Sequence, residues 1–167
     1  MITIGIPGRE RPYEIRAVAV DFNGTIARDG VLIDGVAERV RTLVAAGVEV
    51  HVLTADTYGT VEAQCAGLGV KVRPFAHAGA AVCKEEIVRG LAAAAGCEPG
   101  AGSGICAIGN GFNDVQMFDA AELRICVLEA EGAYAGLFAH ADVVVRDACD
   151  AFDLLLRPDR LRATLRN

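Results

Sequence analysis

Short apolar segments alternate along this chain with longer segments of helical periodicity, and this alternation limits the possible folds more than any other feature. The near-continuous apolar runs AVAV (17–20) and ICAI (105–108) are typical of strands buried on both faces of a parallel sheet. Strand and helix patterns follow one another through short connections, as they do in βαβ units. The sequence therefore predicts an α/β fold, a Rossmann-like three-layer α/β/α sandwich with a mostly parallel sheet.

The individual elements can be predicted from the same patterns. A glycine, Gly47, is expected to close the first helix, and Asp56 or Thr57 to cap the second. No repeat, low-complexity tract or long linker divides the chain, so residues 1–167 are predicted to form one domain. Strands are expected at 2–6, 14–22, 48–56, 70–75, 104–111, 123–129 and 142–145, and helices at 34–47, 57–69, 78–96, 112–121, 131–141, 147–156 and 158–166.

Composition excludes several classes of function. A formal net charge of −6 and only 5% aromatic residues argue against a nucleic-acid partner. No apolar run approaches the ~20 residues that a membrane-spanning helix needs, and the N-terminus lacks the pattern of a signal peptide. The six cysteines never occur in C-x-x-C spacing, which favours reduced, buried thiols over disulfides or zinc. We therefore expect a cytoplasmic protein with no membrane contact.

Polar residues that could carry chemistry follow the predicted strands. Asp21 comes after AVAV, Thr54 after VHVL, and the segment GNGFND (109–114) after ICAI. Ligands of open parallel sheets bind outside the carboxyl ends of the strands, where these residues would meet. Lys84 could reach the same edge from the start of its helix. A carboxylate nucleophile with hydroxyl and ammonium groups suits phosphoryl transfer, and Mg²⁺ between Asp21 and Asp114 would offset charge repulsion.

Taken together, these residues resemble the motifs of the haloacid dehalogenase-like (HAD) phosphatase superfamily. The first motif, D-x-D-G-T, corresponds to DFNGT (21–25), the second to the Thr of VLTAD, the third to the Lys of VCKEEIV, and the fourth, G-D-G-x-N-D, to GNGFND. Within that superfamily, the chain resembles the small, stand-alone, soluble P-type ATPase-like members. The resemblance implies catalytic roles for Asp21, Asn23, Thr54 and Lys84, substrate binding by Thr54, Ala55, Lys84, Gly24 and Asn113, and a Mg²⁺ site of Asp21, Asn23, Asp114 and Asn110.

Two asparagines depart from the phosphatase pattern. Asn23 stands where phosphatases of this superfamily have the Asp that protonates the leaving group and activates water, and an amide can do neither. Loss of a general acid/base costs about 10²–10⁴ in rate. Asn110 replaces a second acidic residue and should weaken Mg²⁺ binding. P-type ATPases also lack an acid at the position of Asn23. We therefore expect a slow phosphatase or phosphotransferase that acts through an aspartyl phosphate.

The spacing of the motifs leaves no room for a cap domain. Core elements fill the segments between Asp21, Thr54 and Lys84, and IARDGVLIDG (26–35) can form only a small flap. An open site of this kind would accept a bulky substrate or be covered by a neighbouring subunit. The expected partners are a phosphorylated small molecule or macromolecule, and a second copy of the chain.

Less specific interpretations stay open for several residues. Asn23 and Asn110 each precede a glycine, and Asn-Gly is also the commonest tight-turn pair. His51, His77 and His140 show no metal-ligand spacing and are expected to be structural. A non-catalytic domain of the same fold, which binds a phosphorylated metabolite or a protein, is the alternative function. Retention of Asp21, which such a domain has little need of, favours the enzyme.

Overall fold

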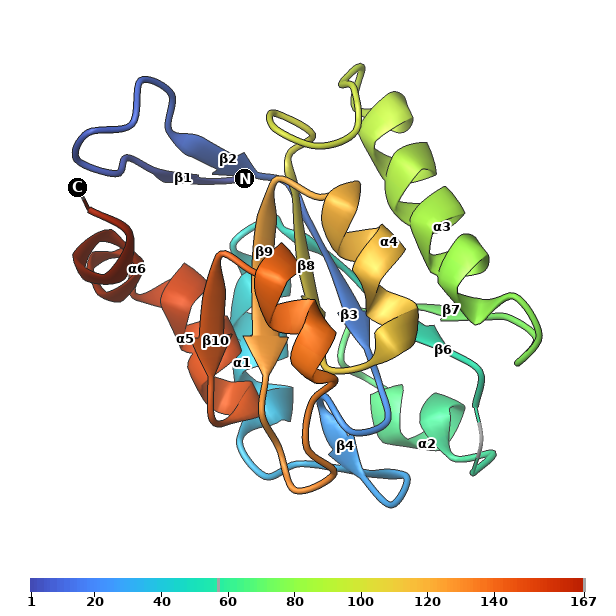
Figure 1. Cartoon of the computed structure of the whole chain (residues 1–167). Coiled ribbons are helices and arrows are strands. Elements are labelled where there is room, and N and C mark those ends of the chain that lie inside the picture. Colours follow the sequence, from blue (N-terminus) through green and yellow to red (C-terminus); the bar gives the residue numbers. More distant parts are fainter. Residues whose placement is uncertain (57, 167) are drawn as a thin grey trace.

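A six-stranded parallel sheet forms the centre of the molecule (Figure 1). The computed structural model describes residues 1–56 and 58–166. The strand order is β10-β9-β8-β3-β6-β7, and every neighbouring pair in this sheet is parallel. The predicted α/β fold is therefore confirmed. The strands are β3 (Ala17–Asp21), β6 (Glu49–Thr54), β7 (Lys71–Pro74), β8 (Ile105–Gly109), β9 (Leu123–Val127) and β10 (Val143–Val145).

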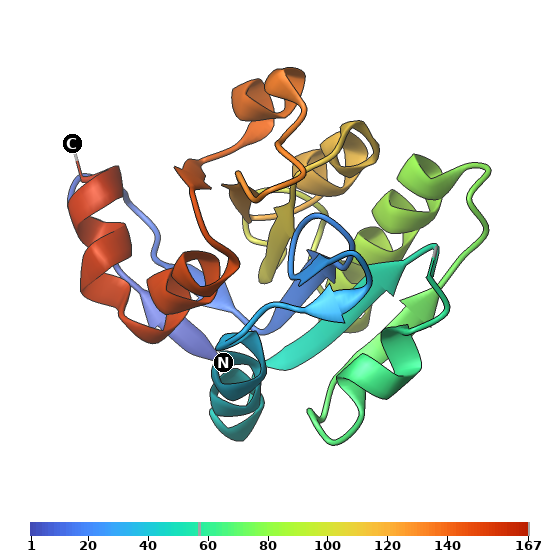
Figure 2. The same cartoon turned by 90° about the horizontal axis from the view of Figure 1, so that it is seen from below.

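Helices cover both faces of this sheet (Figure 2). Strand β3 shows why two layers are needed, because Val18 and Val20 pack into one core whereas Ala17 and Ala19 pack into the other. One face is covered by α1 (Val36–Ala45), α2 (Val61–Cys65), α5 (Ala148–Leu156) and α6 (Pro158–Leu165), and the other by α3 (Ala80–Ala94), α4 (Val115–Asp119) and the 3₁₀ helix η2 (Ala135–His140).

The prediction of a single strand over 14–22 is wrong in one respect, because this segment forms two strands. Strand β2 (Tyr13–Ile15) pairs antiparallel with β1 (Ile2–Ile4) outside the main sheet, and only β3 belongs to that sheet. The chain changes partners at Arg16, where the backbone N–H groups of Arg16 and Ala17 both donate to the Gly104 carbonyl, at 2.8 and 3.3 Å. Burial changes at the same point, from alternating in β2 to complete along most of β3.

The helix predicted at 57–69 is shorter than expected. It begins at Val61 with Thr60 as N-cap, so the expected cap at Asp56 is displaced by four residues. Asp56 Oδ1 nevertheless accepts the N–H groups of Thr60 and Val61, at 3.1 and 3.3 Å, and so still satisfies the start of the helix. The alternative cap, Thr57, lies outside the described residues. The helix predicted at 112–121 begins as the 3₁₀ helix η1 (Phe112–Asp114), and the one predicted at 131–141 is also 3₁₀.

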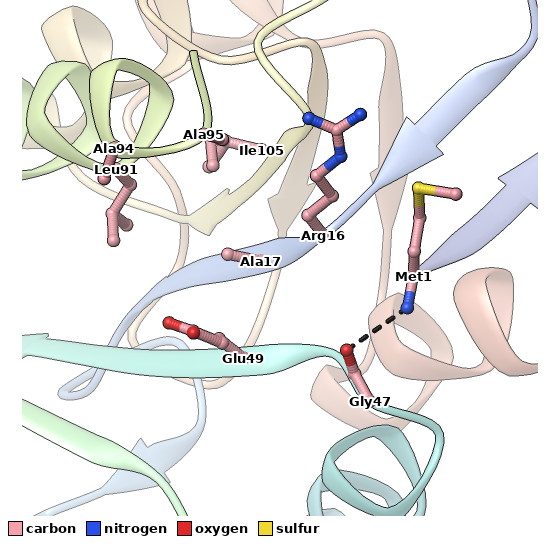
Figure 3. Close-up of a pocket in the computed structure, with 9 residues that line it drawn as sticks. All are labelled: Met1, Arg16, Ala17, Gly47, Glu49, Leu91, Ala94, Ala95 and Ile105. Carbon is pink, nitrogen blue, oxygen red and sulfur yellow. Dashed lines mark hydrogen bonds between the residues drawn. The ribbon is translucent and has the colours of Figure 1, made fainter. Parts of the chain in front are cut away.

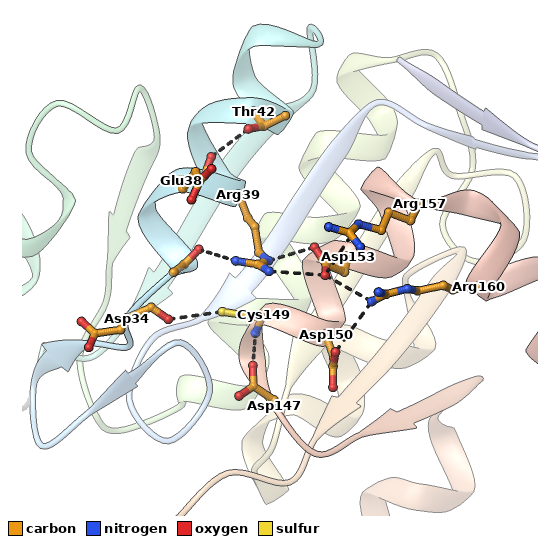
Figure 4. A network of polar contacts seen from close by, with 11 residues as sticks. Asp34, Glu38, Arg39, Thr42, Asp147, Cys149, Asp150, Asp153, Arg157 and Arg160 are labelled. Atoms are coloured by element: carbon orange, nitrogen blue, oxygen red, sulfur yellow. Dashed lines mark hydrogen bonds and ion pairs between the residues drawn. The ribbon is translucent and has the colours of Figure 1, made fainter.

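One buried carboxylate joins the helices on the α1 side (Figure 4). Asp153 in α5 accepts from Arg39 of α1 at 2.8 Å and from Arg160 of α6 at 3.2 Å, and Arg157 lies 4.0 Å away. Burial alone raises the pKa of Asp153, but the bond from Arg39 and the charge of the guanidinium groups outweigh it and lower that pKa. The three helices are thus connected through charge-assisted bonds.

Two further observations concern the cysteines and the helices. All six cysteines are free. Among the described residues, no helix combines the length and the apolar character that crossing a bilayer requires.

Candidate active site

Lys84 lies between two carboxylates at the carboxyl edge of the sheet. Its Nζ is 2.6 Å from Asp21 Oδ1 and 2.6 Å from Asp114 Oδ1. Asp21 ends β3, Lys84 belongs to the first half of α3, and Asp114 ends η1. The structure therefore brings together three predicted residues from separate parts of the chain.

Burial and charge act against each other in this group. The pKa of Asp21 is raised to about 6, chiefly because of burial; Lys84 acts to lower this pKa, and the nearby Asp114 acts to raise it. Burial lowers the pKa of Lys84, but the charges of the two carboxylates outweigh this effect and raise it. One ammonium group thus faces two carboxylates, so the charges within this group would attract a further cation.

Asp114 is fully buried and has partners at both oxygens. Oδ1 accepts from Lys84, and Oδ2 accepts the N–H groups of Asn110 and Gly111 at 3.0 and 2.8 Å. A methyl group added at Gly109 would lie 2.5 Å from Asp114 Cγ, so only glycine leaves room for this carboxylate. The G-N-G-x-N-D motif is therefore a turn built around Asp114.

Thr25 is a site residue for which no role was predicted. Its hydroxyl oxygen is 3.1 Å from Asp21 Oδ2 and 3.1 Å from Asn110 Oδ1. A hydroxyl carries one proton, so it can donate to only one of these oxygens at a time. Its place as the fifth residue of the DFNGT segment was the available indication. Thr25 connects the first motif to the fourth.

The turn that follows Asp21 is closely packed. Asn23 Oδ1 is buried without a hydrogen-bond partner among the described residues. Gly24 has φ +76°, and its N–H donates to the Ala27 carbonyl at 2.9 Å, so this N–H already has a partner. A methyl group at Gly24 would lie 2.6 Å from Asn110 Nδ2 and 2.8 Å from Glu131 Oε2. The Glu131 carboxylate, which the sequence did not indicate, therefore lies beside the first and fourth motifs.

Thr54 occupies the end of β6 with its hydroxyl proton available. The side chain is 1% exposed, and its Oγ1 accepts the N–H of Asp56 at 2.8 Å. An accepting hydroxyl keeps its own proton for another partner. Thr54 is thus suited to donate to an anion in front of Asp21.

These residues surround a cavity of about 190 Å³. Most of the predicted site residues line it, whereas Gly24 and Asp114 do not. His77, predicted to be structural, lines the cavity together with Phe75 and Ala80, which were not predicted. The lining residues are Asp21, Asn23, Thr54, Ala55, Phe75, His77, Ala80, Lys84, Asn110 and Asn113.

The predicted flap over the site is a two-stranded hairpin, β4 (Ala27–Arg28) and β5 (Val31–Leu32). Arg28 and Asp29, at its tip, are both exposed to solvent, and Arg28 also pairs with Glu129 at 3.1 Å. The Gly30 carbonyl accepts from Thr60 Oγ1 at 2.6 Å. These contacts hold the flap against the loop after β9 and the segment before α2.

A larger cavity, of about 370 Å³, lies at the opposite edge of the sheet (Figure 3). Its charged side chains already have partners, since Glu49 pairs with Lys71 at 2.8 Å and Arg16 with Glu14 at 3.6 Å. The apolar part of its wall comes from α3 and β8, through Leu91 and Ile105 among others. The groups suited to catalysis belong to the smaller cavity.

Solved structures of similar architecture include hydrolases named as members of the HAD family or superfamily, and this chain has the HAD-like fold. A 3-deoxy-D-manno-octulosonate 8-phosphate phosphatase from Moraxella catarrhalis, in complex with magnesium, phosphate and KDO, is 16% identical, with 92% of this chain and 95% of that chain covered and a TM-score of 0.72. The cobalt-bound phosphatase of that kind from Haemophilus influenzae is 16% identical, with 93% and 95% covered and a TM-score of 0.66. At these identities the likeness concerns the fold.

One curated sequence is similar enough to define a family. The uncharacterized protein MJ0073 of Methanocaldococcus jannaschii is 49% identical over 63 residues, which cover 38% of this chain and 68% of that protein. The chain belongs to the same family as MJ0073. No family model matches the sequence.

Proposed function

We propose that this protein is a Mg²⁺-dependent phosphatase or phosphotransferase of the HAD type that acts through an aspartyl phosphate at Asp21. The observation that carries the proposal is the position of Lys84, 2.6 Å from both Asp21 and Asp114 beside a cavity that Thr54 also lines. A buried ion pair of this kind is expensive to maintain for stability alone. Its place at the carboxyl edge of the sheet, where ligands of such folds bind, favours a functional role.

Each residue has a distinct task in the proposed reaction. An oxygen of Asp21 attacks phosphorus while the bond to the ester oxygen breaks, and the products are an aspartyl phosphate and an alcohol. Thr54 and Lys84 hold the phosphate oxygens as charge develops on them. Asn113, whose Oδ1 is 3.4 Å from Lys84 Nζ, and the backbone at Ala55 complete the phosphate pocket. Gly24 serves by shaping the turn, because its N–H is donated to Ala27.

The oxygen atoms around Asp21 fit a cation that is held through few charges. The described residues include no group of three or more His, Cys, Asp and Glu side chains placed to hold a metal ion. Mg²⁺ commonly binds through one or two carboxylates with water and substrate phosphate as the other ligands. Asp21, the Asn23 carbonyl and Asn110 Oδ1 would hold it. Asp114 would act indirectly, by holding Lys84 in place. When bound, Mg²⁺ would neutralise charge on the phosphate.

Glu131 would compensate for the neutral Asn110. Its carboxylate lies beside Gly24, on the side where the Asn110 amide is packed. The Asn110 Nδ2 group donates to the Gly132 carbonyl at 3.0 Å, which holds the loop that carries Glu131 against the site. We propose that Glu131 restores negative charge near the cation without contacting Asp21.

The substrate is a phosphorylated small molecule in this proposal, as in the phosphatases of similar fold, although an open cavity would also admit a phosphorylated macromolecule. Phe112 is 69% exposed and packs edge-on against Tyr134, with ring centres 5.2 Å apart. The Tyr134 N–H donates to the Asn110 carbonyl, so this aromatic pair borders the site. This exposed aromatic pair supports the proposal that a second copy of the chain covers the cavity.

Two further parts of the proposal rest on the sequence and the thiols. The lack of an acid at Asn23 supports the P-type ATPase-like group, and the free cysteines support a cytoplasmic location.

Phosphate release from a panel of phosphorylated metabolites, with and without Mg²⁺, tests the proposal. Wild-type protein should release phosphate, and chelation of Mg²⁺ should stop the release. The Asp21→Asn variant should fold and release none, because it lacks the attacking oxygen but keeps the shape of the side chain. Release by Asp21→Asn at the wild-type rate would show that Asp21 is not the nucleophile.

The two asparagines favour a second candidate, a non-catalytic domain that binds a phosphorylated metabolite or a protein. Asn23 and Asn110 stand at positions where hydrolysis and tight Mg²⁺ binding would each use an acidic residue. Such a domain would bind a phosphorylated ligand equally well with Asn at position 21. Binding of the ligand without turnover by both wild type and Asp21→Asn would establish this candidate.

A further inference from the structure

We propose that His77 is the proton-transferring residue of this site, in place of the acid that Asn23 cannot provide. The inference rests on the proposed phosphatase function and names the residue that completes it. His77 lines the cavity in front of Asp21, together with Thr54 and Lys84. In this role it is a catalytic residue in the strict sense, because the proton transfer requires contact with the leaving group.

The fold brings His77 to the site through the segment between β7 and α3. The Phe75 N–H donates to the Thr54 carbonyl at 3.0 Å, which extends the pairing of β7 with β6 beyond Pro74. His77 follows two residues later, and α3 begins at Ala80, which also lines the cavity. The imidazole therefore occupies a wall shared with Thr54 and Ala80.

Asp21 and His77 differ in their exposure. The Asp21 side chain is 13% exposed, whereas His77 is exposed to solvent. In an in-line displacement the attacking oxygen and the leaving oxygen lie on opposite sides of phosphorus. An oxygen displaced by Asp21 would therefore leave on the side of phosphorus away from the buried carboxylate, toward solvent, to which His77 is exposed.

The chemistry of the cavity leaves few other candidates for the proton. The other titratable groups that line it are Asp21 and Lys84. Asp21 forms the bond to phosphorus, and Lys84 is held between two carboxylates that raise its pKa. Histidine changes charge near neutral pH and is the commonest general acid and base.

The two half-reactions balance with water as the only co-reactant. In the first, Asp21 bonds to phosphorus, the bond from phosphorus to the ester oxygen breaks, and the His77 imidazolium gives its proton to that oxygen. In the second, water attacks phosphorus, neutral His77 takes a proton from the water, and the bond between Asp21 and phosphorus breaks. Inorganic phosphate leaves, and His77 and Asp21 return to their starting states.

The test compares His77→Gln with His140→Gln, using an alkyl and an aryl phosphate. His140 is a matched control because it is partly exposed, pairs with Asp119 at 2.7 Å and belongs to η2 rather than to the cavity wall. The kcat of His77→Gln for the alkyl phosphate should fall about 10²-fold or more, the range expected for general acid catalysis. The kcat for the aryl phosphate should fall far less, because its leaving group depends less on protonation.

A second variant distinguishes proton transfer from a structural role. In His77→Ala, added imidazole should restore alkyl phosphate hydrolysis in proportion to its concentration, and the same addition should leave His140→Ala unchanged. Two results would overturn the role of His77 alone, given that the wild type is active. One is a His77→Gln variant whose kcat and pH profile equal those of wild type, and the other is a His77→Ala variant that imidazole does not rescue. Wild-type protein without any phosphate release would overturn the role of His77 together with the phosphatase function.

Discussion

Lys84 Nζ and Asp114 Oδ1 are 2.6 Å apart, and both side chains are fully buried. The carboxylate is in turn held by the N–H groups of Asn110 and Gly111. This pair places the ammonium group against Asp21. The position of Lys84 therefore depends on the GNGFND segment, which holds Asp114. A buried pair of this kind also makes the site sensitive to the loss of either partner.

Replacement of Lys84 should therefore destabilise the protein. In Lys84→Met the carboxylates of Asp21 and Asp114 lose their shared cation, and the free energy of unfolding should fall by about 3–5 kcal/mol. Urea denaturation at neutral pH measures the change. The control is Lys71→Met, which breaks the exposed pair with Glu49 and should cost less than about 1 kcal/mol. Equal losses in the two variants would contradict the assignment of a stabilising role to Lys84.

A methyl group at Gly109 should displace Asp114. The added carbon would lie 2.5 Å from Asp114 Cγ, so Gly109→Ala should cost about 1–3 kcal/mol, as overpacking of a core does. Gly90→Ala is the matched control, since a methyl group there meets nothing within 4 Å and Gly90 lies within α3. It should stabilise the protein by about 0.5–1 kcal/mol. Thermal unfolding that ranks the two variants in the reverse order would refute the packing argument.

His51 should make stability depend on pH. It is fully buried, and its Nδ1 accepts from Arg73 at 3.3 Å while Nε2 lies 3.0 Å from Glu49. Burial lowers the pKa of His51 in the folded state. Below a pH of about 6.5 the unfolded chain therefore binds the proton first, so stability is complete above that pH and falls as the pH decreases.

The measurement is the free energy of unfolding between pH 7.5 and 5.5, chosen to span the ordinary histidine pKa of about 6.5. Wild type should lose more stability across this range than His51→Gln, whose side chain does not titrate. His140→Gln, which leaves the buried histidine in place, should behave as wild type does. Parallel curves for wild type and His51→Gln would show that burial of His51 does not shift its titration.

A carboxylate at position 23 should substitute for His77. Asn23→Asp supplies an acid/base at the position where the HAD phosphatases, whose motifs this sequence resembles, have one. It should raise hydrolysis of alkyl phosphates by part of the ~10²–10⁴ that such catalysis contributes. In the Asn23→Asp, His77→Gln double variant, it should restore activity that His77→Gln lacks. Steady-state kinetics with alkyl and aryl phosphates provide the measurement. Loss of activity in Asn23→Asp that folds normally would count against the proposed role of position 23.

Glu131 should contribute to cation affinity. Removal of a charge that acts from outside the direct ligands costs about 10- to 100-fold in metal affinity, so Glu131→Gln should bind Mg²⁺ more weakly by that factor. Calorimetry on Asp21→Ala, Glu131→Gln and wild type without substrate measures this directly, and Asp21→Ala should show the larger loss. The control is Glu38→Gln, in the first turn of α1. Equal affinity in Glu131→Gln and wild type would remove Glu131 from the cation site.

The sequence alone determined the class of fold and the edge of the sheet at which the site lies. Apolar runs at 17–20 and 105–108 specify buried parallel strands, because burial on both faces leaves no polar alternation. Asp21 and Thr54 follow such runs directly, so their place at the carboxyl ends depended only on local pattern. The change of strand partner at Arg16 was not predicted: the sequence indicated one strand over 14–22, whereas burial alternates in β2 and is continuous along most of β3.

Only the tertiary structure decided which further residues join the predicted ones at the site. His77 and Glu131 stand in the segments after β7 and β9, and no local pattern distinguishes them from other loop residues. They reach opposite sides of the site because β3 lies between β8 and β6, which places the segments from β9 and β7 on either side of Asp21. The contact of Lys84 with both carboxylates likewise depends on the packing of α3 against η1. Such contacts between distant segments arise from the strand order, which local periodicity does not encode.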